Sequence, residues 1–189
     1  VVIDSELRPG VLNYGELILP GEEKDEIFIS TYVCHPSMAN NELSGPVVAT
    51  ALARWINNQI DRRYTYRFIF IPETIGAINY LSSHHKELKK NVITGFNLTC
   101  VGDDRKYSFR PSINGNTLAD KLALYVFKSN EISFDHYNFL DRGSDERQYC
   151  WPGIDLPIVS IMRSKYGTYP EYHTSDDNLS LISPGGLLG

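Results

Sequence analysis

The sequence predicts an α/β fold with a mixed, mostly parallel central sheet and helices on both of its faces. Short β-rich runs alternate with helical patterns along the whole chain. The runs at 27–33 and 66–71 are mostly apolar, as in strands that are buried on both sides. Polar clusters follow several of these runs, and ligand sites of open α/β sheets lie beyond strand ends. We expect one domain over residues 1–189, as a fragment of a longer chain.

Each strand is predicted from β-branched and aromatic residues bounded by turn signals. Pro20 and Gly21, for example, separate two such runs. The segments expected to form strands are 1–3, 12–19, 26–33, 66–71, 91–101, 107–110, 133–139 and 156–162.

Helices are predicted from apolar periodicity and from start signals. Pro46 suits a first helical turn, and the apolar face expected after it is Val47, Val48, Ala51, Leu52, Trp55 and Ile56. Further helices are expected at 75–84 and 144–150. Thr117 and Asp120 resemble a capping box, and the helix that follows is expected to bury Leu118, Leu122 and Val126. Ser183 and Pro184 would open a last helix, while 34–46 and 169–177 are expected to be polar loops.

Composition excludes several classes of protein. The net charge is −5 and the basic residues are scattered, so we expect no nucleic-acid and no membrane partner. No apolar run approaches the roughly 20 residues that span a bilayer. The three cysteines do not form a CxxC pair, which favours a reducing compartment and a cytoplasmic location.

The residues with the clearest chemical potential follow strands. His35 leads the loop after one strand, and Asn41 to Gly45 place a potential oxygen ligand just before a helix. Glu73 ends another strand. It either caps the following helix or acts as a general base, and one carboxylate can do both.

Two further segments carry polar groups. His173 is followed by Asp176 and Asp177, which would either orient its imidazole or cap a helix. The loop around Asp145 and Glu146 is either a solvated charged loop or a surface that binds a cation or a substrate amine. No Walker loop, GxGxxG or GxSxG is present, and the adjacent Cys34 and His35 give a thiol protease little support.

In this order the segments resemble the di-zinc aminopeptidase family, which also contains glutaminyl cyclases and glutamate carboxypeptidases. The segments that carry the resemblance are CHPSMANNELSGP, PETIGAINYLS, NLTCVGDD, DRGSDERQYC and YPEYHTSDD. More closely, they resemble bacterial aminopeptidase-like proteins associated with polysaccharide biosynthesis, whose members carry extra domains. The resemblance implies that His35 and His173 are metal ligands and that Glu73 is the general base.

The departures from the family pattern concern carboxylates. Asn41 replaces the bridging Asp, while Thr74 and Thr99 replace a ligand Glu and a ligand Asp. Ser37 replaces the Asp that orients the first His. Two adjacent cations need a bridging carboxylate. We therefore expect at most one zinc ion, held by His35, His173 and one oxygen. Asn41 is the matching position for that oxygen, and the alternatives are Glu42, Asp145, Glu146 or a water.

Two functions follow. The first is a metal-dependent hydrolase of the aminopeptidase type that cleaves a peptide or an amide of a small amino compound. In it Glu73 is the base and Asp145 or Glu146 binds the substrate amine. The second is a catalytically degenerate peptidase fold that binds an amino sugar or a peptide in polysaccharide or cell-envelope metabolism. In both cases other domains of the same chain are expected partners.

Overall fold

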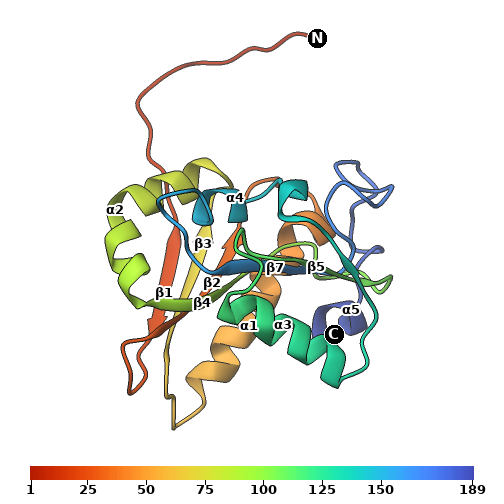
Figure 1. Ribbon diagram of the computed structural model, residues 1–189. Coiled ribbons are helices and arrows are strands. Elements are labelled where there is room, and N and C mark those ends of the chain that lie inside the picture. The colour runs from red at the N-terminus through yellow and green to blue at the C-terminus, as the bar shows by residue number, and fades with distance from the viewer.

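The computed structural model describes residues 1–189 and contains one seven-stranded sheet with the strand order β1-β3-β2-β4-β7-β5-β6 (Figure 1). The pairs β2/β3, β2/β4, β4/β7 and β5/β6 are parallel, whereas β1/β3 and β5/β7 are antiparallel. The predicted mixed, mostly parallel sheet is therefore confirmed. The strands are β1 (Gly15–Leu19), β2 (Glu26–Tyr32), β3 (Thr65–Ile71), β4 (Val92–Leu98), β5 (Tyr107–Arg110), β6 (Phe134–His136) and β7 (Ile158–Met162).

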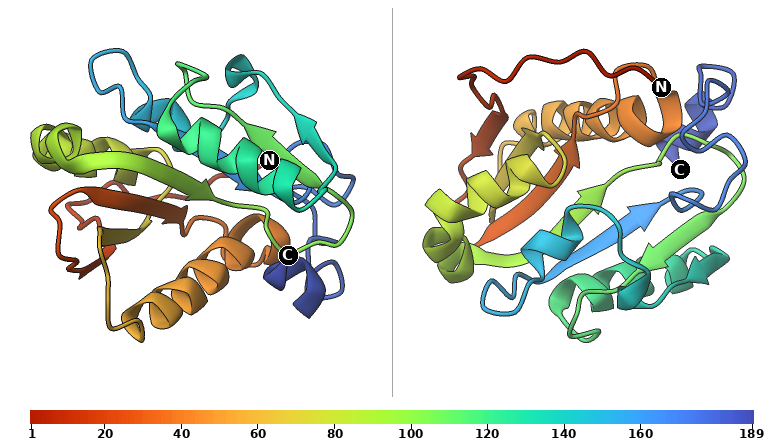
Figure 2. Two further views of the ribbon diagram at one scale, coloured as in Figure 1. Left: turned by 60° about the horizontal axis from the view of Figure 1, so that its bottom comes forward. Right: turned by 90° about the horizontal axis from the view of Figure 1, so that it is seen from above.

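Helices cover both faces of the sheet, as predicted. In Figure 1, α2 and α4 lie above the sheet and α1 and α3 lie below it. The short α5 contacts the start of α1 (Figure 2). The helices are α1 (Ser44–Asn57), α2 (Ile75–Asn91), α3 (Leu118–Ser129), α4 (Glu146–Tyr149) and α5 (Pro184–Leu188), with a π-helix η1 (Ala39–Leu43) and a 3-10 turn η2 (Phe139–Asp141).

The core is divided between the two faces because neighbouring strand residues point in opposite directions. On β2, Phe28 packs with the α2 and α4 side, whereas Ile29 packs with Ala49 and Ala53 of α1. On β7, Ile158 belongs to the first of these clusters and its neighbour Val159 packs with α3. Both faces of the central strands are buried, which explains why their sequences read as continuous apolar runs.

Two segment predictions were wrong. Residues 1–3 are exposed and pair with no strand, and Figure 1 shows the N-terminal segment leading away from the sheet. Residues 39–43 are not a loop but the π-helix, which leads directly into α1. In addition, α2 continues to Asn91, well past the expected end at 84, because Leu88 on its inner side is fully buried.

The buried faces of two helices also differ from prediction. In α1, Ile56 is buried as expected, but Val47 and Trp55 are exposed. In α3, the expected Leu118, Leu122 and Val126 are 43%, 40% and 49% exposed, while Ala119, Ala123 and Phe127 are buried. Alanines let each helix lie close to the sheet, so the small residues face inward and the larger aliphatic ones lie at the margin.

Several helix ends are as predicted. The capping box of Thr117 and Asp120 is present at the start of α3. Ser183 caps α5, with Pro184 in its first turn. No helix has the length and apolar character that crossing a bilayer requires.

Candidate functional site

The predicted site residues emerge where parallel strands end. β2 leads to Cys34 and His35, and β3 leads to Glu73. These two segments lie close enough for the charge of His35 to lower the pKa of Glu73. Gly45 lets the start of α1 approach the sheet, because a Cβ there would collide with Thr31 and with the backbone of Leu98. The loop that carries His35 is thereby held against the strand ends.

His35 and His173 face each other although 138 positions separate them in the sequence. Their ring centroids are 4.5 Å apart. The His173 ring also stacks on Tyr172 at 3.9 Å, and its backbone has a φ of 57°. His173 is exposed, but partial desolvation and the nearby His35 lower its pKa, which favours the neutral imidazole that metals bind.

Glu42 forms the closest contact of His35. Its Oε1 lies 2.6 Å from Nδ1 of His35, and its Oε2 accepts a hydrogen bond from the backbone N–H of Cys34 at 2.9 Å. Cys34, His35 and Glu42 each offer one potential ligand atom, and these atoms lie within 4.8 Å of one another. Burial and the carboxylates of Glu42 and Glu73 raise the pKa of the Cys34 thiol. The thiol is therefore not activated as a nucleophile, which needs a lowered pKa.

Asn41 is buried, and its amide group is only partly used. Nδ2 donates to the Tyr32 hydroxyl at 2.8 Å and lies 3.7 Å from Cys100 Sγ, whereas Oδ1 has no hydrogen-bond partner. An unpaired buried amide oxygen is uncommon, and it is available to a cation. Oδ1 is thus an unpaired oxygen on the residue that the family pattern offers as the third ligand.

Through its Nδ2, Asn41 contacts a network of neutral groups. The Tyr32 and Thr99 hydroxyls are 2.5 Å apart, and Thr99 Oγ1 is 3.5 Å from Cys100 Sγ. Cys100 in turn lies 3.7 Å from the Tyr169 hydroxyl. Burial raises the pKa of Cys100 to about 12, so the thiol stays protonated. The position of the expected ligand Asp is therefore filled by groups that hydrogen-bond to one another and carry no charge.

Asp177 is hydrogen-bonded to the Tyr169 end of this network. Its two carboxylate oxygens accept the backbone N–H groups of Asn40 and Asn41, at 2.6 Å and 3.1 Å. The second oxygen also accepts the Tyr169 hydroxyl at 3.1 Å. Asp177 therefore ties the segment after His173 to the segment that carries Asn41, rather than capping a following helix.

Glu73 is half-buried beside these groups. Burial raises the pKa of its carboxylate, and the charges of Glu42 and Glu146 add to the increase. A hydrogen bond to Ser144 and the nearby His35 act in the opposite direction. A carboxylate whose pKa is raised is a stronger base than an exposed one, as general-base catalysis near neutral pH requires.

Asp145 is fully buried and lies next to the backbone of Thr74. Its Oδ1 accepts the Thr74 N–H at 2.7 Å, while Oδ2 has no partner. Burial raises the pKa of Asp145 to about 8, with the charge of Glu73 contributing. Thr74 adopts a φ of 61°, a strained conformation for a β-branched residue that the bond to Asp145 helps to hold.

Glu146 has a different role from its neighbour. Its carboxylate is buried in an ion pair with Arg110 and accepts the backbone N–H groups of Gly143 and Ser144, both at 3.0 Å. Burial alone would raise the pKa of Glu146, but Arg110 holds it below the usual value. The carboxylate that the sequence offered for a substrate amine is thus engaged in fixing the loop around Asp145.

Sequence reasoning missed Arg110 and the contact between Glu42 and His35. A lone arginine in the predicted strand 107–110 was the available signal, since a buried strand excludes an unpaired charge. Arg110 is completely buried, and its guanidinium also contacts Tyr166 and Ser160.

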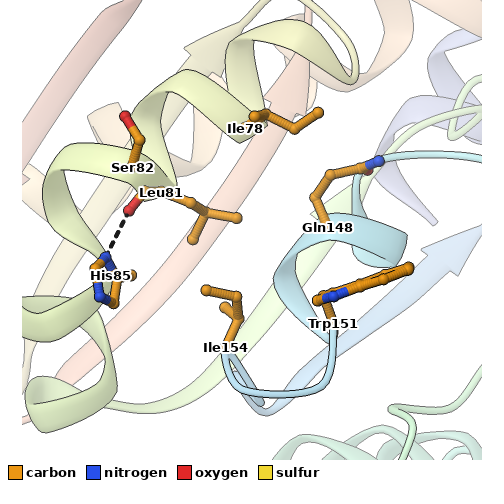
Figure 3. Close-up of a pocket in the computed structure, with 7 residues that line it drawn as sticks. All are labelled: Ile78, Leu81, Ser82, His85, Gln148, Trp151 and Ile154. Atoms are coloured by element: carbon orange, nitrogen blue, oxygen red, sulfur yellow. Dashed lines mark hydrogen bonds between the residues drawn. The ribbon is translucent and has the colours of Figure 1, made fainter.

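A separate apolar hollow of about 440 Å³ lies between α2 on one side and α4 with the segment after it on the other (Figure 3). Its lining residues are Ile78, Leu81, Ser82, His85, Gln148, Trp151 and Ile154. His85 Nδ1 lies 3.1 Å from the Leu81 carbonyl oxygen, so this nitrogen is already engaged. None of the predicted site residues lines the hollow.

Comparison with known proteins places this geometry in a class. A curated protein of Clostridium acetobutylicum, named for a suspected role in polysaccharide biosynthesis and for its aminopeptidase-like domain, is 43% identical over 99% of this chain and 42% of its own length. The crystal structure of a suspected peptidase from the same organism matches 92% of this chain and 40% of that chain, at 41% identity and a TM-score of 0.88. A zinc aminopeptidase of Bacillus subtilis matches 93% and 46% of the two chains, at 18% identity and a TM-score of 0.73.

The fold is therefore that of the aminopeptidases, and the predicted resemblance is confirmed. Residues 4–189 match the model of the family DUF4910, which is described as a domain of unknown function. The chain belongs to this family. It spans about 42% of the length of the curated relative that it matches.

Proposed function

We propose that this protein is a metal-dependent hydrolase of the aminopeptidase type, with a single zinc site, that cleaves a peptide or an amide of a small amino compound. The observation that carries the proposal is the pairing of His35 with His173, with ring centroids 4.5 Å apart and with Glu73 nearby. The peptidase names of relatives and the aminopeptidase fold support the same class of reaction.

The residues present fit one zinc ion. His35 and His173 offer imidazole nitrogens, and the buried Oδ1 of Asn41 offers an oxygen that no protein group uses. An amide oxygen is a weaker zinc ligand than a carboxylate, so we expect lower affinity than in a site with a bridging Asp. When bound, zinc would polarise an amide carbonyl and make water more acidic.

A second zinc ion has no comparable support. Asn41, Thr74 and Thr99 occupy the positions where the family pattern has carboxylates. The structure surrounds Asn41 and Thr99 with Tyr32 and Cys100, whose groups are neutral and hydrogen-bonded to one another. None of these groups is a carboxylate ligand, and Asp177, the carboxylate bonded to the network, already accepts hydrogen bonds from Asn40, Asn41 and Tyr169.

The protein groups would divide the remaining work. Glu73, with its raised pKa, would take the proton from the attacking water and deliver it to the leaving amine. Asp145 would bind the substrate ammonium through its unpaired Oδ2, which is fully buried and would have to become accessible on binding, because a cation favours the ionised carboxylate. Glu146 is the weaker candidate for that contact, since Arg110 already neutralises it.

A specific observation favours a second candidate function. The neutral network around Asn41 suits a degenerate peptidase fold that binds a ligand without hydrolysing it. The ligand would be an amino sugar or a peptide, in keeping with the polysaccharide-biosynthesis name of the Clostridium relative. In either case we propose a cytoplasmic location, which the three free cysteines support.

Glu73→Gln separates the two functions. If the protein is a hydrolase, aminopeptidase activity with added zinc falls about 10²- to 10⁴-fold in this variant, because the general base is lost. Zinc binding, measured by calorimetry, is expected to persist. Glu22→Gln makes the same chemical change at an exposed position and should leave the activity unchanged.

The outcomes are distinct. Wild-type protein that is inactive on amino-acid amides and short peptides, with zinc present, contradicts the hydrolase and favours the binding module. Wild-type activity that survives Glu73→Gln contradicts the role of Glu73.

A further inference from the structure

Glu42 has a carboxylate that protein groups engage on both oxygens. It is 4% exposed and lies in the π-helix η1, one position after Asn41. Both of its carboxylate oxygens are already occupied: Oε1 by Nδ1 of His35 at 2.6 Å and Oε2 by the Cys34 N–H at 2.9 Å. The two contacts join the loop after β2 to the start of the helical segment. Because Glu42 contacts both the His35 ring and the neighbouring Cys34 backbone, it fixes the orientation of that ring.

The chemistry of the contact determines the tautomer of His35. An ionised carboxylate can only accept hydrogen bonds, so the proton of a neutral imidazole must lie on Nδ1. The lone pair is then on Nε2, the nitrogen that remains available to a metal. In a neutral histidine without such a partner, nothing fixes which ring nitrogen carries the proton. The nearest ring is that of His173, at 4.5 Å between centroids.

We propose that Glu42 is the positioning residue of the site: it holds His35 in the Nδ1–H tautomer and leaves Nε2 for a cation shared with His173. The family pattern has a carboxylate at position 41, where it would bind the metal. This chain has a carboxylate at position 42 instead, where it orients a metal-binding histidine. It performs the orientation that Ser37 is unable to perform. The part of the proposal that concerns zinc rests on the proposed function, whereas the tautomer does not.

Glu42→Gln tests the proposal with little change in shape. A glutamine offers one acceptor oxygen and one NH₂ donor, so it is unable to accept from both His35 and Cys34. Nitrogen-15 NMR of the histidine rings in metal-free protein reports the tautomer, and a His35→Gln variant assigns the signal among the five histidines. We expect Nδ1–H at His35 in the wild type and a shift toward Nε2–H in Glu42→Gln. Glu22→Gln should leave the signal unchanged.

Zinc affinity gives the second readout. Loss of an outer carboxylate that orients a ligating histidine typically weakens metal binding about 10- to 100-fold, and we expect that loss in Glu42→Gln. A backbone amide NMR spectrum close to that of the wild type shows that the variant is folded, and Glu42→Asp, which keeps a carboxylate, should recover part of the affinity.

Two results would overturn the inference: Nε2–H at His35 in the wild type, or the same tautomer and zinc affinity in Glu42→Gln as in the wild type. If wild-type protein binds no zinc but the tautomer depends on Glu42, the positioning role is supported and the zinc site of the proposed function fails.

Discussion

At the scale of single residues, two adjacent buried carboxylates have opposite properties. Arg110 and two backbone N–H groups favour the ionised form of Glu146, whereas Asp145 forms no ion pair and burial raises its pKa to about 8. Different environments of neighbouring carboxylates separate their pKa values, as in sites where one group is ionised and the other is an acid. The two residues therefore lead to different predictions.

Asp145→Asn should raise the free energy of unfolding relative to the wild type, and this gain should increase as the pH rises. The pKa of Asp145 is about 8 in the folded state because of burial, while an unfolded Asp titrates near pH 4. Between these values the folded state holds a proton that the unfolded state has lost, so wild-type stability falls as the pH increases and levels off above about 8. Each pKa unit corresponds to about 1.4 kcal/mol. Asparagine has no such cost and keeps an acceptor for the Thr74 N–H.

Urea unfolding of wild type and Asp145→Asn at several pH values, from about 5 to about 9, measures the effect. The free-energy difference between the two proteins should grow across this window. A difference that does not depend on pH would contradict the buried, protonated carboxyl.

Arg110→Met should lower the free energy of unfolding by about 3–5 kcal/mol, because it leaves the buried Glu146 without its counter-charge. Arg105→Met is the matched control: Arg105 pairs with Glu171 in a solvent-accessible position, where an ion pair contributes little. Chemical denaturation compares the two variants, and equal losses would contradict the anchoring role of Arg110. The double variant Arg110→Met/Glu146→Gln should recover part of the loss, because it removes both charges.

At the scale of elements, the register of α3 decides which residues support the sheet. Phe127 is buried and stacks on Phe134, with ring centroids 4.5 Å apart. Phe127→Ala should therefore cost about 3–5 kcal/mol of unfolding free energy. Val126→Ala, one position earlier and 49% exposed, should cost much less. A larger loss of unfolding free energy for Val126→Ala than for Phe127→Ala, measured by thermal or urea unfolding, would instead support the helix face that the sequence pattern indicated.

The sequence predicted the existence of most elements because apolar runs and helix caps are local signals. Thr117 with Asp120 and Ser183 with Pro184 are examples, and both caps are present. The inward face of α3 was missed because leucine is more hydrophobic than alanine and therefore dominates a predicted apolar face. Close packing on a sheet favours the small residues instead. An isolated strand such as 1–3 was overpredicted because local propensity does not supply a partner strand.

The site was predictable only in part. Family motifs indicated His35, Glu73 and His173, and the structure brings the two histidines together. The contact of Glu42 with His35 and the ion pair of Arg110 with Glu146 depend on tertiary geometry that no local pattern encodes. Residues 36 positions apart meet in that ion pair because β5 and α4, which begins at Glu146, both lie against β7.

At the scale of the whole molecule, the parallel strands at the centre of the sheet bring distant segments to one edge. His35, Glu73 and the segment before Asp103 follow β2, β3 and β4, which are neighbours in the sheet. The loop that carries His173 joins them through Asp177 and its bonds to Asn40 and Asn41. The fold therefore brings residues from most of the chain to one edge of the sheet, where the proposed metal site lies.

We propose that His35 and His173 together hold one zinc ion and no more. Elemental analysis of purified protein, equilibrated with zinc and freed of excess metal, gives the number of zinc ions per chain. We expect one zinc per chain in the wild type and none in the His35→Ala/His173→Ala double variant. Two zinc ions per chain, no zinc in the wild type, or zinc retained by the double variant would rule the proposed site out.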